Sequence, residues 1–169
     1  MRILIIFIFL ISNSLASEVI DLKNLKINKE LKKYDELTFL DDKNRLLDIN
    51  EFRGNLILLN FWATWCAPCK EEMPSLDSLQ THKKLNNLRI FPINVGKDNL
   101  EKSSKFFEEL KIKNLKVYFD SSITLAKKLG LRGIPTSILI NKDGLEFARI
   151  IGSIDFKNEK FIDWLSNYN

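Results

Sequence analysis

The feature that most constrains the fold is the segment Trp62-Ala63-Thr64-Trp65-Cys66-Ala67-Pro68-Cys69-Lys70, which contains both cysteines of the chain. It lies between an apolar run, Leu56 to Trp62, and a helical pattern. Cys-x-x-Cys spacing holds two sulfurs close enough to bond, and Pro68 pre-sets the backbone for a helix start. Cys66 is therefore expected at a helix N-terminus, where unpaired N–H groups and the dipole favour a thiolate. Because the thiolate is the attacking form, the segment predicts thiol–disulfide exchange.

Two other roles for the cysteines stay open at this point. A static bridge is one, although a bridge that closes so short a loop removes little entropy from the unfolded chain. Half of a zinc site is the other, but structural zinc usually takes four ligands. His82, the one histidine, would be the third ligand, and no fourth soft ligand is evident. We therefore expect no metal and no cofactor beyond a redox-active Cys66–Cys69 disulfide, and we expect His82 to face solvent without a role.

The N-terminus has the pattern of a secretory signal peptide. Arg2 precedes nine apolar residues, Ile3 to Ile11, and small residues follow at Ser14 and Ala16. This pattern predicts cleavage after Ala16 and export to the periplasm. The run is shorter than the roughly 20 residues of a membrane span, and a retained N-terminal anchor, with the domain outside the cytoplasm, is the alternative. The predicted division of the chain is a signal peptide (1–16), a polar leader (17–36) and a single domain (37–169).

Charge and composition exclude one class of partner. The formal net charge is only +4, and the lysines are dispersed among acidic residues. Such a pattern is typical of solvated helix faces, so we expect no nucleic-acid partner. An exported protein normally accumulates stable disulfides, yet this chain has a single closely spaced pair. The pair is thus expected to be re-reduced by another component.

Periodicity and turn residues predict alternating strands and helices. We expect a hairpin at 37–40 and 45–48, strands at 55–62, 88–95, 115–119, 137–140 and 145–151, helices at 68–85, 100–110, 122–129 and 156–168, and a short helical turn at 28–33. This order predicts an α/β layer sandwich with a mixed sheet. In such sheets the crevice beyond the carboxyl ends of the strands holds the chemistry, and the cysteines follow the strand that ends near Trp62.

Two motifs carry a resemblance to a known family. The segment from Asn60 to Pro74 closely resembles the active-site segment of TlpA/ResA-type thioredoxin-like proteins, and Gly130 to Gly144 resembles their second landmark. The resemblance covers roughly residues 37–167. It implies a thioredoxin-like three-layer sandwich, with a central mixed β-sheet, helices on both faces, an N-terminal β-hairpin and an insertion within residues 97–119.

The resemblance also implies an activity and partners. Proteins of this family are exported thiol–disulfide reductases that serve cytochrome c or cytochrome oxidase assembly. The partners would be a disulfide-containing client protein and a membrane-embedded thiol carrier that supplies electrons. We expect the chain itself to be a monomer.

Four residues are predicted to be catalytic. Cys66 attacks the client disulfide, and Cys69 resolves the mixed disulfide. Glu72 follows Cys69 by three residues, hence on the same helix face. It is either a surface glutamate favoured by the dipole, or a functional group that accepts the proton of Cys69 or raises the pKa values of the cysteines by its charge. Pro135, read alone, is a turn proline. The resemblance favours a functional role for Glu72 and implies a cis Ile134–Pro135 bond that faces the cysteines.

The docking surface for a client is predicted to include Trp65, Ala67, Pro68 and Ile134. The backbone of Ile134 would pair with a bound peptide as a strand does. Two other residues near the motif are not expected to contact a client. Trp62 is predicted to belong to the core, and Asn60 stands where the similar cytosolic thioredoxins carry a buried aspartate. An amide cannot take a proton, and this difference favours the TlpA/ResA branch.

Other functions stay open. A disulfide-donating oxidase is the first, although the Ala67-Pro68 pair lacks the histidine that stabilises the thiolate in oxidant-type motifs. The second is a copper-handling or partner-binding module that uses the thiols as ligands. A general cytosolic thioredoxin is the third, and the N-terminal leader argues against it.

Overall fold

A computed structural model describes residues 22–169, so the predicted signal peptide (1–16) lies outside the described residues. Within the described range, one eight-stranded sheet has the order β1-β8-β7-β4-β5-β6-β2-β3. The strands are β1 (Leu25–Lys32), β2 (Thr38–Leu40), β3 (Leu46–Asp48), β4 (Leu56–Trp62), β5 (Leu88–Asn94), β6 (Tyr118–Phe119), β7 (Thr136–Ile140) and β8 (Glu146–Ile151). The α-helices are α1 (Ala67–Leu79), α2 (Leu100–Glu109), α3 (Thr124–Lys128) and α4 (Glu159–Ser166), with 3-10 turns η1 (Ile49–Phe52) and η2 (Lys83–Leu85).

Strand β4 is the centre of the molecule, and every residue in it is buried. It pairs in parallel with β5 and antiparallel with β7, which makes the sheet mixed. Successive side chains of a strand point to opposite faces. Leu56, Leu58 and Trp62 therefore enter one core, whereas Ile57, Leu59 and Phe61 enter the other.

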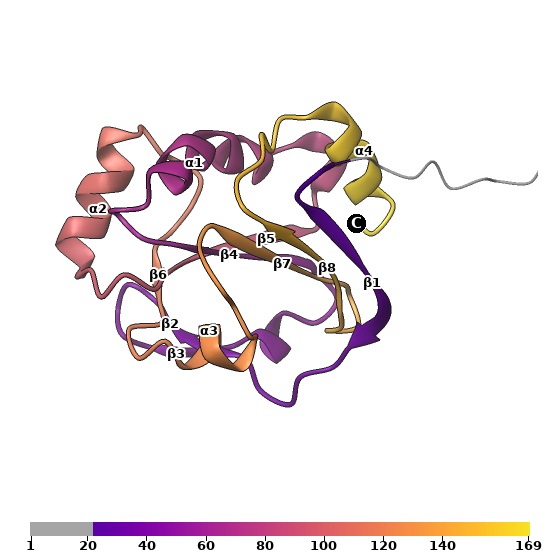
Figure 1. Ribbon diagram of the computed structural model, residues 1–169, viewed down its shortest axis with the longest axis horizontal. Helices are drawn as coiled ribbons and strands as arrows, with labels where there is room; N and C mark the ends of the chain where they lie inside the picture. Colours follow the sequence, from indigo (N-terminus) through magenta and orange to yellow (C-terminus); the bar gives the residue numbers. More distant parts are fainter. Residues whose placement is uncertain (1–21) are drawn as a thin grey trace, which may run out of the picture.

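Helices cover both faces of the sheet. Figure 1 shows α1 and α4 above the central strands and α3 below them. The cores agree with this view, because the first contains Met73 of α1 and Phe161 of α4, and the second contains Leu125 of α3. The predicted three-layer α/β sandwich is confirmed. No helix within residues 22–169 is both long enough and apolar enough to cross a bilayer.

The predicted hairpins are confirmed. Strands β2 and β3 pair antiparallel, and β2 also pairs with β6. Strands β7 and β8 form the second antiparallel hairpin; Gly144 in its turn has a φ of 81°, a left-handed conformation that glycine adopts without strain. The segment 97–119, predicted as an insertion, contains α2 and β6.

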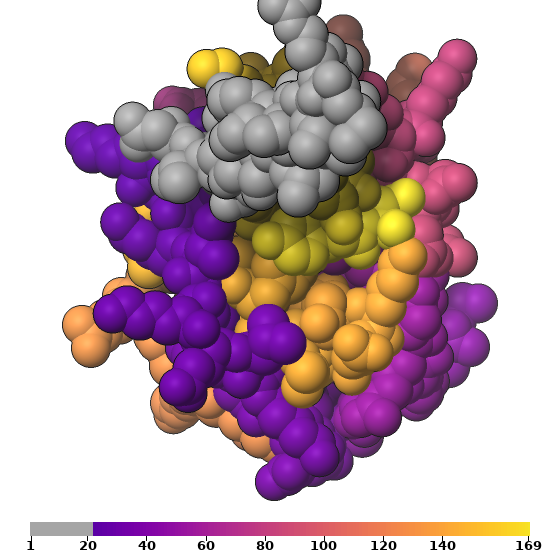
Figure 2. Space-filling view, turned by 90° about the vertical axis from the view of Figure 1, so that its right-hand side faces the viewer, coloured from indigo at the N-terminus to yellow at the C-terminus, as the bar shows by residue number. Residues whose placement is uncertain are grey.

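The predicted helical turn at 28–33 is wrong, because residues 28–32 belong to the edge strand β1, which pairs antiparallel with β8. Figure 2 shows this indigo segment at the side of the molecule, next to the orange and yellow of later residues. Asn28 donates a hydrogen bond to the side chain of Glu146, 118 residues away. Such a tertiary contact outweighs the weak local preferences of a polar segment.

Several predicted helices and strands are longer than the observed ones. The helix after the cysteines ends at Leu79, and the separate turn η2 carries the buried Leu85. The terminal helix begins only after its N-cap Asn158, whose side chain accepts the N–H of Phe161. Strand β6 has two residues, and helix α3 has five.

Candidate active site

The two cysteines form a disulfide at the point where β4 leads into α1. Cys66 is the N-cap of α1, and its Sγ accepts the backbone N–H of Cys69 at 3.3 Å. Cys66 is 5% exposed and Cys69 is 0% exposed, so Cys66 is the more accessible of the two residues. Once the bridge is reduced, the N-terminus of α1 favours the thiolate of Cys66.

The residues before Cys66 form a tight turn. The N–H of Cys66 donates to the carbonyl of Ala63 at 3.1 Å, so Thr64 and Trp65 are the central residues of this turn. Trp65 is 68% exposed. Trp62, by contrast, is buried and stacks on Phe106 at a centroid distance of 4.9 Å, which confirms its predicted place in the core.

The second motif lies at the same end of the sheet. The register pairs Thr136 of β7 with Phe61 of β4, so Pro135 precedes β7 where β4 runs out towards the cysteines. The Ile134–Pro135 bond is cis, as the resemblance implies. Pro135 is buried and Ile134 is half-buried.

The predicted docking residues are mostly at the surface. Trp65, Ala67 and Pro68 are exposed around the more accessible cysteine, while Ile134 is half-buried. Their contact with a client remains a prediction.

Glu72 is buried on the inner face of α1, not at the surface as the alternative interpretation required. Asn60 of β4 donates its side-chain N–H groups to Glu72 Oε1 at 2.8 Å and to Ser137 Oγ at 3.0 Å. Burial raises the pKa of the Glu72 carboxyl to about 7, although hydrogen bonds from Asn60 and from the backbone of Ile154 oppose part of the rise. A buried carboxyl that titrates near neutral pH can exchange a proton with a neighbouring thiol.

Sequence reasoning missed two residues near the site, Ser137 and Asp98, and misjudged His82, which lies beyond the other end of α1. Ser137 shares the Asn60 amide with Glu72. Asp98 accepts the N–H of Thr64 at 3.1 Å, and 34 residues separate the two, so no local pattern could have indicated the contact. His82 has a structural role: it is half-buried, and its Nδ1 accepts the N–H of Lys84 in η2.

Within residues 22–169, no group of three or more histidine, cysteine, aspartate and glutamate side chains is arranged to hold a metal ion.

The sheet, the Cys66–Cys69 pair at a helix N-terminus and the cis proline define a thiol–disulfide oxidoreductase with a thioredoxin-like fold. A family model described as Redoxin matches residues 22–158, and the chain therefore belongs to the Redoxin family.

Curated relatives agree with this class. Thiol-disulfide oxidoreductase ResA of Bacillus thuringiensis subsp. konkukian is 28% identical over 130 residues, which cover 77% of this chain and 72% of that protein. Thiol:disulfide interchange protein DsbE of Vibrio cholerae is 29% identical over 149 residues, which cover 88% of this chain and 78% of the relative. The TlpA/ResA-type resemblance is thereby confirmed, and the protein is an oxidoreductase of the ResA and DsbE type.

Solved structures support the fold. StoA from Bacillus subtilis superposes with a TM-score of 0.63 at 25% identity, covering 76% of this chain and 95% of that one. A thiol:disulfide interchange protein of the thioredoxin family from Chlorobium tepidum gives a TM-score of 0.66 at 19% identity, covering 82% and 99%. The latter likeness concerns the fold alone.

Proposed function

We propose that this protein is an exported protein-disulfide reductase that reduces disulfides of client proteins in cytochrome c or cytochrome oxidase assembly. The observation that carries the proposal is that α1 has a cysteine, Cys66, at its N-cap and a buried carboxyl, Glu72, further along the same helix. The first favours an attacking thiolate, and the second can take the proton of the resolving thiol.

The first step is attack on the client. The thiolate of Cys66 attacks one sulfur of a client disulfide, a new bond joins Cys66 to that sulfur, and the other client sulfur leaves as a thiolate that takes a proton from solvent. Trp65 and the neighbouring exposed residues Ala67 and Pro68 would contact the client polypeptide during this step.

The second step resolves the mixed disulfide. Glu72, when ionised, accepts the proton of Cys69, and the Cys69 thiolate attacks the sulfur of Cys66. The second client sulfur leaves as a thiolate and is protonated. The client has then gained two electrons, and the Cys66–Cys69 disulfide must be reduced again. A membrane-embedded thiol carrier would supply those electrons.

The direction of transfer can be tested directly. The Ala67-Pro68 pair places no histidine between the cysteines, which favours a reducing potential. Equilibration of the purified protein with glutathione buffers should give a potential well below the roughly −120 mV of strong oxidants. A value near −120 mV would contradict the reductase proposal and support the disulfide-donating oxidase.

The client can be captured. In Cys69→Ser the resolving thiol is gone, and mixed disulfides with Cys66 should accumulate in cells. The matched control is Cys66→Ser, which keeps the buried thiol but should capture nothing. Recovery of a polypeptide with a Cys-x-x-Cys-His haem-attachment motif, or of an oxidase assembly protein, supports the proposal. Equal capture by both variants contradicts the assigned roles.

Export has its own test. N-terminal sequencing of the protein purified from its native cells should begin at Ser17. A chain that retains residues 1–16 and sediments with membranes would support the anchor alternative. Size-exclusion chromatography of the reduced protein should show the expected monomer.

A further inference from the structure

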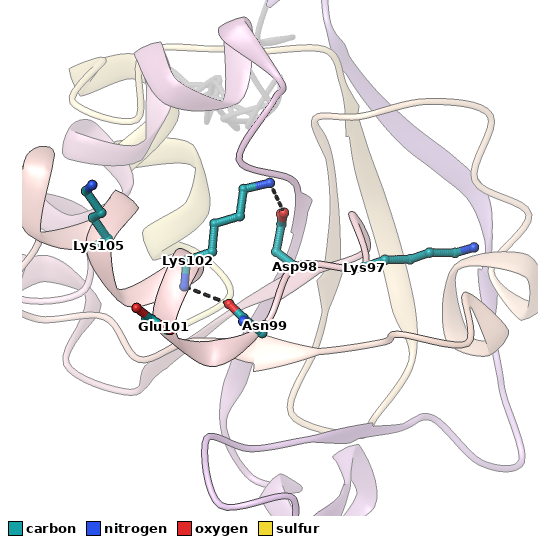
Figure 3. A pocket seen from close by; sticks show the side chains of 6 residues that line it. All are labelled: Lys97, Asp98, Asn99, Glu101, Lys102 and Lys105. Atoms are coloured by element: carbon teal, nitrogen blue, oxygen red, sulfur yellow. Dashed lines mark hydrogen bonds and ion pairs between the residues drawn. The ribbon is translucent and has the colours of Figure 1, made fainter.

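A pocket beside the N-terminus of α2 adjoins the turn that carries the cysteines (Figure 3). Its lining residues are Lys97, Asp98, Asn99, Glu101, Lys102 and Lys105. Asp98 is buried and the other five are exposed. Figure 3 shows Lys97 and Lys105 pointing in opposite directions away from Asp98, whereas Lys102 reaches Asp98 directly. The lysines thus share no common ligand position, and the chemistry of this region centres on Asp98.

The Asp98 carboxylate has three donors from three elements. Its Oδ2 accepts the backbone N–H of Thr64 at 3.1 Å and the side-chain N–H of Asn94 at 3.0 Å. Its Oδ1 accepts from the Lys102 ammonium, one turn along α2. Burial alone would raise the pKa of Asp98, but the hydrogen bonds from Lys102, Asn94 and Thr64 outweigh it and hold the pKa below its usual value. Asp98 is therefore a charged acceptor, which makes the bond to Thr64 stronger than a neutral one.

The Thr64 N–H belongs to the Ala63–Cys66 turn. The turn is closed by the hydrogen bond from Cys66 N to Ala63 O, and the Thr64 N–H within it donates to Asp98. Gly96 shows how closely the two loops approach: a Cβ atom at Gly96 would lie 2.7 Å from Ala63 Cβ and 3.1 Å from Trp65 Nε1. The β5–α2 loop is thus packed directly against the turn that presents Trp65 and Cys66.

We propose that Asp98 is a positioning residue for thiol–disulfide exchange, because its carboxylate accepts the Thr64 N–H and so holds Trp65 and Cys66 in the orientation that a client polypeptide meets. Asp98 makes no contact with either sulfur; its effect passes through the turn. Lys102 and Asn94 keep the carboxylate in place.

Small and large disulfide substrates should depend on Asp98 to different degrees. A small disulfide reagent needs only the Cys66 thiolate, which the N-terminus of α1 supplies without Asp98. A polypeptide must also fit the surface around Trp65 before its disulfide reaches Cys66. Loss of the Thr64 anchor should therefore slow the reaction with a polypeptide more than the reaction with a small reagent.

The experiment compares these two substrates, and its peptide arm rests on the proposed function. The reduced full chain is mixed with 5,5′-dithiobis(2-nitrobenzoic acid) or with a disulfide-bonded Cys-x-x-Cys-His peptide. Asp98→Ala should lower the second-order rate for the peptide about tenfold and that for the small reagent less than about threefold. Asp98→Asn keeps an oxygen that can accept the Thr64 N–H and should recover most of the peptide rate.

Asp41→Ala is the matched control. Asp41 is also buried, accepts two backbone N–H groups, at Lys43 and Arg45, and pairs with a basic side chain four residues later. It lies in the β2–β3 turn, away from the cysteines, so the ratio of the two rates should not change. An equal ratio in Asp98→Ala and Asp41→Ala, or no recovery in Asp98→Asn, would overturn the proposal.

Amide hydrogen exchange keeps the two proposals separate. The Thr64 N–H should exchange slowly in the wild type and in Asp98→Asn, and at least about tenfold faster in Asp98→Ala. If the wild type does not reduce the peptide, the proposed function fails while the Thr64 measurement still decides the role of Asp98. Unchanged protection of Thr64 in Asp98→Ala would end the positioning proposal regardless of the rates.

Discussion

At the scale of single residues, Glu72 is a carboxyl group whose surroundings oppose its ionisation. It is buried against β4, and Asn60 is the side chain that donates to it. The pKa rises from 4.5 to about 7, chiefly through burial. Between those two values the folded protein holds a proton that the unfolded chain releases. The free energy of unfolding therefore falls as the pH rises from about 4.5 to 7 and stays low above that range.

The direction of this pH dependence gives a test of the surroundings of Glu72. With the disulfide intact, Glu72→Gln should be more stable than the wild type at pH 8, by up to about 3 kcal/mol, because glutamine fills the same volume without a charge. At pH 4.5 and below, the two proteins should differ little, because the wild-type carboxyl is protonated. Urea unfolding at both pH values measures the difference.

The neighbouring position supplies the control. Glu71 is exposed, and Glu71→Gln removes one carboxylate without touching the buried site. Its stability should follow the wild type at both pH values. If Glu72→Gln also follows the wild type at pH 8, the carboxyl is not the desolvated group described above.

At the scale of elements, the site depends on the contact between the β4–α1 turn and the β5–α2 loop. Gly96→Ala should destabilise the protein by about 1–3 kcal/mol, because the added methyl would overlap the rigid Cβ of Ala63 and the Asp98 carboxylate. Gly133→Ala, with no atom within 4 Å of its added Cβ, should stay within about 1 kcal/mol of the wild type. Thermal or urea unfolding compares the two variants. Equal losses would show that the loops do not pack as described.

The elements also show what the sequence could and could not predict. Strand β4, the hairpin β7–β8 and the position of Cys66 follow from apolar runs, turn residues and one proline, all of which are local signals. Strand β1 was missed because its residues alternate little in hydrophobicity and owe their conformation to β8. The Asp98–Thr64 bond was missed for the same physical reason: it joins two loops that only the folded sheet brings together.

At the scale of the whole molecule, a buried ion pair in β8 lies beside the N-terminal strand β1, its neighbour in the sheet. Glu146 is fully buried in β8, and Arg149 donates to both of its carboxylate oxygens. Asn28 and Tyr34 donate to the same carboxylate from the N-terminal segment. Arg149 also donates to the carbonyl of Leu129, at the end of α3. This charge cluster therefore connects β1, β8 and the end of α3 at one edge of the sheet.

Removing one member of this cluster should cost more than removing the pair. Arg149→Met leaves the buried Glu146 carboxylate with only the exposed Lys32 ammonium, 3.9 Å from its Oε1, and should lower the free energy of unfolding by about 3–5 kcal/mol. In the double variant Glu146→Gln/Arg149→Met, the amide oxygen can still accept from Asn28 and the amide N–H can donate to the Tyr34 hydroxyl. No charge is then left buried, so a large part of that loss should return. A double-mutant cycle by urea unfolding at pH 7 measures this coupling. If the double variant is as unstable as the sum of the single ones, the two side chains do not act as a pair, and β1 is held to the sheet by its backbone hydrogen bonds instead.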